Sequence, residues 1–132
     1  HAAKSIKDIR NDIVHFESAG QPALAAYGQR LRDLMTEFYL ALYSVRNVAD
    51  DTVGPSDIVE LNQLLRHGHD EIHRTIYSDI RLDRLEENDI SSVLNANREL
   101  YASCRSLVNG IAVFVLPAEQ MATLENLPGS VV

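Results

Sequence analysis

The chain has 132 residues, of which 45% are hydrophobic, and its formal net charge is −7. This length and apolar content suit one packed domain. The acidic balance argues against a nucleic-acid partner and against docking on anionic lipid, because both need clustered lysine and arginine. Acidic faces suit metal ions or basic partners better.

The longest uninterrupted apolar run, residues 110–116, is far shorter than the roughly 20 residues that span a bilayer. The N-terminus has no signal-peptide profile. We therefore expect a soluble fragment that does not itself insert into a bilayer. The chain begins with His1 rather than methionine and enters a helical pattern almost at once, which is typical of an expressed fragment or a processed chain. His1 is a candidate tag residue.

Four segments carry apolar residues at helical spacing, and short stretches with glycine, proline, serine or aspartate separate them. They cover about residues 2–18, 22–49, 57–83 and 88–116. Pro22 suits the first turn of the second helix, Ser56 is the expected N-cap of the third, and Pro117 stops the fourth. No strand is expected. Because short loops force antiparallel neighbours, the sequence predicts an all-α, up-down bundle of four helices over residues 1–116, followed by a flexible C-terminal tail, 117–132.

Each predicted helix has an apolar stripe that should face the core. The stripes contain Ile6, Ile9, Ile13 and Phe16; Leu24, Tyr27, Leu31, Leu34, Phe38, Leu42 and Val45; Ile58, Leu61, Leu65, Ile72 and Ile76; and Ile90, Val93, Leu94, Leu100, Tyr101, Cys104, Leu107, Val108, Ile111 and Val115. The single cysteine, Cys104, therefore reads as a buried thiol in a reducing compartment. Two polar residues, His69 and Asn97, also fall on these stripes.

The string "DISSVLNANRELYASCRSLVNGI", residues 89–111, resembles the last helix of the PhoU-like domain at the C-terminus of bacterial sodium-dependent phosphate (Na/Pi) cotransporters. The opening "AAKSIKDIRNDI", residues 2–13, is similar to the first helix of that domain. The resemblance implies a regulatory domain that controls phosphate uptake by helix–helix contact. Its partner would be a membrane transporter domain of the same polypeptide, and the intact protein would place it at the cytoplasmic face of the inner membrane.

Asp8 and Asp12 are four residues apart, so both carboxylates lie on one side of the first predicted helix, and His15 follows one turn later. Asp79 and Asp83 have the same spacing. The PhoU proteins that the domain resembles hold metal ions on acidic pairs of this spacing, and carboxylates suit hard or borderline cations. The sequence thus offers a divalent metal site, with a solvated acidic face as the alternative interpretation.

The string "RHGHDEIH", residues 66–73, has the highest density of potential ligands. His69 and His73 are four apart, a spacing that lets two imidazoles share one metal. Because His69 falls on an apolar stripe, a hydrogen-bonded interior histidine is the alternative. The string lacks the HExxH arrangement of a zinc protease.

Asn97 lies on the core stripe of the fourth predicted helix, where a polar side chain costs stability unless its amide is satisfied. One use of such a residue is to fix helix register. Asn95, Arg98 and Glu99 lie off that stripe, and they are candidates for contact with a neighbouring helix or a partner. The resemblance is strongest around these residues, so a partner-facing role for Arg98 is the sharper alternative to register.

No enzyme is expected, because the sequence has no glycine-rich phosphate loop and no recognisable Ser-His-Asp or Cys-His arrangement. A di-metal oxidase bundle would need a Glu-x-x-His motif on each of two helices, and no such motif occurs. Two alternatives to the regulatory domain stay open. One is an independent metal-binding bundle, and the other is a dimerisation module that forms a homo-oligomer.

Overall fold

The computed structural model describes residues 2–47 and 54–115. These residues form four α-helices and no strand. The helices are α1 (Ala2–Ser18), α2 (Pro22–Asn47), α3 (Pro55–Arg81) and α4 (Glu87–Val115). The all-α helical bundle expected from the sequence is confirmed.

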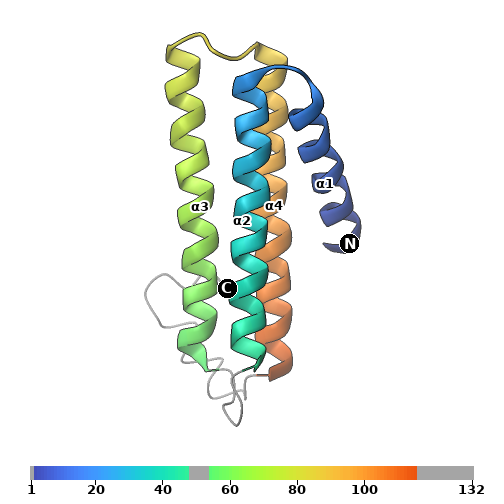
Figure 1. Ribbon diagram of the computed structural model, residues 1–132. Coiled ribbons are helices and arrows are strands. Elements are labelled where there is room, and N and C mark those ends of the chain that lie inside the picture. Colours follow the sequence, from blue (N-terminus) through green and yellow to red (C-terminus); the bar gives the residue numbers. More distant parts are fainter. Residues whose placement is uncertain (1, 48–53, 116–132) are drawn as a thin grey trace.

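The helices run up and down along a common axis, and the α1–α2 and α3–α4 connections lie at the same end (Figure 1). α1 packs on α2 and α4, whereas α3 packs on α4 more extensively than on α2. α2 and α4 also touch each other across the bundle. The bundle is therefore asymmetric, because α1 closes the groove between α2 and α4 on one side and α3 stands on the other.

The apolar stripes form the core. The side chains most completely withdrawn from solvent come from all four helices: Phe16, Phe38, Ile9, Leu31, Ile58, Leu61, Leu65, Ile76, Leu100, Val93 and Val108. The outer members of the stripes, such as Leu42 and Ile111, are half-buried. Burial of one face on each helix, rather than helix propensity alone, stabilises elements of this kind.

The start of α3 differs from the expected one. Gly54 and not Ser56 is the N-cap, because Pro55 suits the first helical position, where a missing N–H costs nothing. The Asp57 carboxylate accepts a hydrogen bond from the Gly54 N–H at 2.9 Å, and the Asp57 N–H donates to the Gly54 carbonyl at 3.1 Å. These two bonds close the first turn, and Ser56 lies within it as an exposed residue.

The end of α3 also comes earlier than the expected Asp83. Asp83 has φ +53°, in the left-handed region, so it cannot continue the helix. Its N–H donates to the Ile80 carbonyl at 3.2 Å, and the Arg84 N–H donates to the Asp79 carbonyl at 3.0 Å, which is the Schellman pattern. Asp83 and Asp79 are therefore not a helical pair, and the second acidic pair read from the sequence was wrong.

Three parts of the expected outline fall outside the described residues. They are His1, the last two residues of the second predicted helix with the loop that follows, and everything from residue 116 on, including Pro117 and the tail 117–132. α4 begins at Glu87, one residue before the expected start. Glu87 and Asp89 place carboxylates in the first turn of α4, where they interact favourably with the positive end of the helix dipole.

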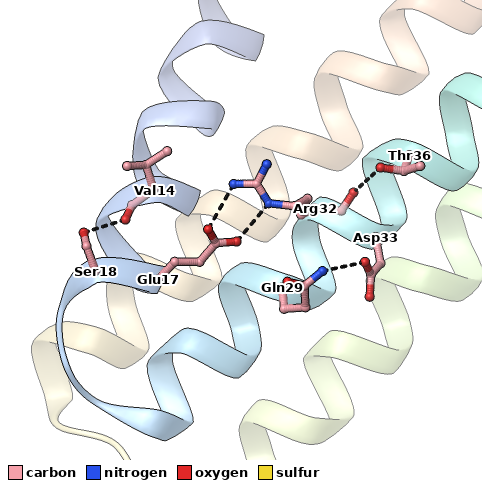
Figure 2. Close-up of polar contacts among 7 residues, drawn as sticks. All are labelled: Val14, Glu17, Ser18, Gln29, Arg32, Asp33 and Thr36. Atoms are coloured by element: carbon pink, nitrogen blue, oxygen red, sulfur yellow. Dashed lines mark hydrogen bonds and ion pairs between the residues drawn. The ribbon is translucent and has the colours of Figure 1, made fainter.

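Polar contacts join α1 to α2 on the outer surface (Figure 2). Arg32 of α2 donates to both carboxylate oxygens of Glu17 of α1, from Nε at 2.9 Å and from Nη2 at 3.0 Å. The hydrogen bond from Arg32 holds the pKa of Glu17 below its usual value. Both side chains are solvent-exposed, so this bidentate pair orients α1 on α2 more than it stabilises the fold.

Candidate functional site

A polar cluster lies between α3 and α4 at the middle of the bundle. It consists of His69 and His73 on α3 and Asn97 and Tyr101 on α4, and we call it the α3–α4 cluster. The ring of His69 lies 4.8 Å from that of Tyr101 and 5.7 Å from that of His73, measured between centroids. The two residues on each helix are four positions apart, so they lie on one side of it. All four side chains therefore meet where α3 packs on α4.

Asn97 is buried as expected, with 1% of its surface exposed. Its Nδ2 donates a hydrogen bond to the backbone carbonyl of His69 at 3.1 Å, while its Oδ1 is buried without a hydrogen-bond partner. The bond ties one position of α4 to one position of α3, which is what a register-fixing residue does. The unpartnered oxygen costs about 1–3 kcal/mol. Asn97 therefore lowers the stability of the fold while it fixes the position of α4 relative to α3.

The unpartnered buried side-chain atoms of the described residues all belong to α3 and α4. They are Nδ1 of His69, Nδ1 of His73, Oδ1 of Asn97 and both amide atoms of Asn62. Asn62 lies two helical turns before His69 on the same face of α3 and is 6% exposed. The seam between α3 and α4 is therefore the part of the core where polar atoms are least satisfied. Sequence reasoning missed Asn62, although its position seven residues before His69 on the stripe was a readable signal.

The acidic pair of α1 lies on a different face. Asp8 and Asp12 are both exposed, and the charge of Glu99 on α4 acts on Asp12. Partial burial and the nearby charges of Asp8 and Glu99 raise the pKa of Asp12, while His15 acts in the opposite direction. Carboxylates of α1 and α4 thus make this an acidic surface, and the repulsion that Asp12 experiences from Asp8 and Glu99 contributes to its raised pKa.

The partner-facing candidates of α4 lie at the surface. Asn95, Arg98 and Glu99 are exposed. Arg98 donates from Nη2 to Oδ1 of Asn95 at 3.0 Å, one helical turn away. Asn95 and Arg98 are therefore held to each other on the outside of α4, whereas Asn97 from the same string points into the seam.

The structure keeps the two pairs of candidate metal ligands apart. Asp8 and Asp12 belong to the α1–α4 face, and His69 and His73 belong to the α3–α4 cluster. Within residues 2–47 and 54–115, no three histidine, cysteine, aspartate or glutamate side chains gather in a way that could hold a metal ion. Each candidate is thus a pair of ligands, which would need water or another group to complete the coordination of a divalent ion.

Cys104 is 1% exposed, as the stripe predicted. Burial raises the pKa of its thiol to about 12. Since the thiolate is the reactive form, Cys104 remains a protonated, apolar core residue at neutral pH.

A partly buried hydrogen bond between α2 and α3 was not visible in the sequence. The Tyr27 hydroxyl donates to Oδ2 of Asp79 at 2.5 Å. Arg84 lies beyond it, with Nη1 3.8 Å from the other oxygen of the same carboxylate. Burial, and then the hydrogen bond to Asp79, raise the pKa of Tyr27. Nothing in the local sequence pairs these two residues, which are 52 positions apart.

A groove between α2 and α3 was also missed. It has an upper hollow of about 240 Å³ at the level of Arg30 and Glu71 and a lower one of about 420 Å³ at the level of Ser44 and Asp57, and Leu64 borders both. The one sequence signal was the pair of neighbouring leucines at 64 and 65, which shows that apolar surface extends beyond the core stripe of α3.

Comparison with known protein families, with curated proteins and with solved structures finds no match to this chain. Within the part of the chain that the structure describes, none of the helices is apolar over a length that would cross a membrane. Because the comparisons find no match, the resemblance to PhoU-like domains rests on the two sequence segments 2–13 and 89–111 alone.

Proposed function

We propose that this bundle is a regulatory interaction module that acts by helix–helix contact, and that its partner is the membrane domain of a sodium-dependent phosphate transporter. The partner rests on the resemblance of residues 2–13 and 89–111 to a PhoU-like domain. An all-α bundle of antiparallel helices is the architecture that this resemblance implies. In this proposal the module adjusts phosphate uptake and carries out no chemistry on phosphate.

The observation that carries the proposal is the split within one string of α4. Asn97 is buried and bonded to α3, whereas Asn95 and Arg98 are exposed and bonded to each other. The buried residue fixes where α4 sits on α3, and this position in turn fixes where the exposed pair is presented. An outward-facing polar pair on a helix whose position is fixed suits recognition of a partner.

The test begins with the reading frame that contains residues 1–132, which should also encode several apolar segments of spanning length. Phosphate uptake is then measured in cells that carry the full protein with Arg98→Glu. Arg66→Glu, at an exposed arginine of α3, makes the same charge change elsewhere. We expect Arg98→Glu to change the uptake rate and Arg66→Glu to leave it unaltered. Equal uptake in both variants and in the wild type, or a frame without spanning segments, overturns the proposal.

A metal-binding bundle is the second candidate, because the structure does bring His69 and His73 together. Their rings are 5.7 Å apart and the Nδ1 atom of each is buried without a partner. Two imidazoles one turn apart can bind one transition-metal ion. Stoichiometric zinc in the purified chain, lost in His69→Ala/His73→Ala, would support this candidate, and metal-free protein would remove it.

A further inference from the structure

The groove between α2 and α3 has an apolar floor. Leu34 and Leu61 are buried at its base, while Ala41, Val45 and Leu64 are half-buried along its walls. Leu34 packs against Gly68, which has no side chain. A Cβ atom at Gly68 would lie 2.4 Å from a methyl carbon of Leu34. The small side chains of Ala41 and Ser44 leave the lower part open. The result is a trough along the bundle axis whose lower part is mainly apolar and whose upper part is more polar.

The length of the trough matches a short helix. It extends along α2 from Arg30 to Val45, which is about 22 Å at 1.5 Å per residue. A helix of about four turns has this length. The same bundle already shows this mode of packing, because α1 lies in the groove between α2 and α4 with its apolar stripe inward. The α2–α3 groove has no such helix over it among the residues that the structure describes.

The rim of the trough is acidic. Asp33 and Glu37 line it on α2, and Asp57, Glu60 and Glu71 line it on α3. Arg30 and His67 are its basic residues, and both lie against Glu71, with His67 Nε2 3.7 Å from the carboxylate. Asp33 accepts a bond from Gln29 on its own helix (Figure 2). Glu37 and Glu60 are exposed on opposite rims, so a ligand that lies in the trough meets negative charge on both sides.

We propose that the α2–α3 groove is the docking site for an amphipathic helix of a partner, whose apolar stripe fills the floor and whose lysine and arginine residues meet the acidic rims. This inference rests on the proposed function and adds a second contact surface, on α2 and α3, to the exposed polar pair of α4. It is a helix-in-groove interaction, in which apolar anchors at i, i+3, i+4 and i+7 supply the contact. Charge on the rims sets the orientation and the association rate.

The charge of the chain itself points to a separate partner. Residues 116–132 contain two glutamates and no lysine or arginine, so they do not complement an acidic rim. A second copy of the chain also carries a net charge of −7. A basic helix from another domain or protein is the occupant whose charge fits.

The test uses an idealised probe, a fluorescein-labelled peptide of about 16 residues with leucine on one helical face and lysine on the flanks. Its binding to residues 1–132 is measured by fluorescence anisotropy, and amide shifts in NMR spectra locate the site. We expect one peptide per chain, with the largest shifts at Ala41 and Leu64. A peptide of the same composition reordered to lose the apolar stripe should bind at least about tenfold more weakly, as should a leucine–glutamate version.

Matched charge reversals separate a specific rim from general attraction. Glu37→Lys/Glu60→Lys changes the two rims, whereas Asp8→Lys/Glu99→Lys makes the same total charge change on the α1–α4 face. The two residues replaced in each variant are exposed. The rim variant should bind the probe about tenfold or more weakly, and the control by less than about twofold. Equal losses in the two variants, or shifts spread over other helices, overturn the inference.

Two further outcomes identify a different occupant and also overturn it. A dimer in light scattering that dissociates when the probe is added would place a second copy in the groove. A large gain in probe affinity on deletion of residues 117–132 would place the chain's own tail there. The proposed function has its own readout. If phosphate uptake responds to Arg98→Glu but not to Glu37→Lys/Glu60→Lys, the proposed function holds and the groove is not the docking surface. If the probe binds the groove but uptake does not change in any of these variants, the groove binds a helix and the proposed function is wrong.

Discussion

The hydrogen bond between Tyr27 and Asp79 predicts how much stability the protein loses when the hydroxyl of Tyr27 is removed. Tyr27 is 3% exposed, and the Asp79 side chain is 13% exposed. Tyr27→Phe keeps the packed ring and deletes the donor at 2.5 Å. The carboxylate then keeps the more distant contact with Arg84, 3.8 Å away. Hydrogen bonds to charged groups contribute about 1.5–3 kcal/mol.

We therefore expect Tyr27→Phe to lower the free energy of unfolding by about 2 kcal/mol. At about 4 °C per kcal/mol for a chain of this size, the melting temperature should fall by about 8 °C. Tyr77→Phe removes a hydroxyl from a ring that is 56% exposed, and it should change the free energy by less than about 0.5 kcal/mol. Urea unfolding at pH 7, followed by circular dichroism at 222 nm, measures both variants.

The pH dependence gives a second check. Burial and the bond to Asp79 raise the pKa of Tyr27 above its usual value of 10.0, so the folded state favours the neutral phenol. The stability this provides is fully present below pH 10 and is lost as the pH rises above it. The Tyr27→Phe variant has no phenol at this position, so it does not lose this contribution at high pH. The raised pKa of Cys104 affects the pH dependence of stability equally in both proteins. The difference in stability between wild type and variant should therefore narrow as the pH rises above 10.

The reasoning fails if Tyr27→Phe melts with the wild type, or if the gap between them stays constant through pH 11. A double-mutant cycle with Asp79→Asn isolates the pair. If the two single losses add in the double variant, Tyr27 and Asp79 do not interact.

Three further predictions concern the buried polar seam and the core. Asn97→Leu should raise the melting temperature, because the lost hydrogen bond contributes about 1 kcal/mol and the unpartnered Oδ1 costs about 1–3 kcal/mol; a single unchanged oligomeric state in light scattering would then contradict a register role. Cys104 should react with a thiol reagent only at the rate of unfolding, since it is 1% exposed and its pKa is about 12; fast labelling of native protein would show the core to be open. If the histidine pair binds metal, cobalt should give visible absorption bands that His69→Ala and His73→Ala abolish and His67→Ala retains, whereas identical spectra in all three variants would assign the cobalt to other ligands.

The helices and the core could be predicted from the sequence because both depend on local periodicity. Apolar residues at a period of 3.6 define one face of a helix, and that face has to be buried. The same argument placed Asn97 and Cys104 in the core. Helix ends were less certain, since the cap of α3 was set by Pro55 and Asp57 rather than by Ser56, and its last residue was set by the left-handed Asp83.

The candidate site was only partly readable. The spacing of Asp8 with Asp12, and of His69 with His73, was correct as a statement about single helices. It could not show that Asp12 would interact with Glu99 and His69 with Tyr101, because those neighbours lie on another helix. The bond from Asn97 to the His69 carbonyl is likewise a contact between helices.

By itself, the sequence determined that this protein folds as amphipathic helices with short connections, because helix formation and the direction of each apolar face follow from residues within a few turns of one another. Tertiary packing decided which helices are neighbours. It set Tyr27 against Asp79, it gave α1 the groove between α2 and α4, and it left the acidic-rimmed trough between α2 and α3. The reason is that the two walls of a groove come from different helices, and its depth depends on how closely those helices approach. Small residues such as Gly68 and Ala41 affect that approach only through the side chains of the neighbouring helix that pack against them.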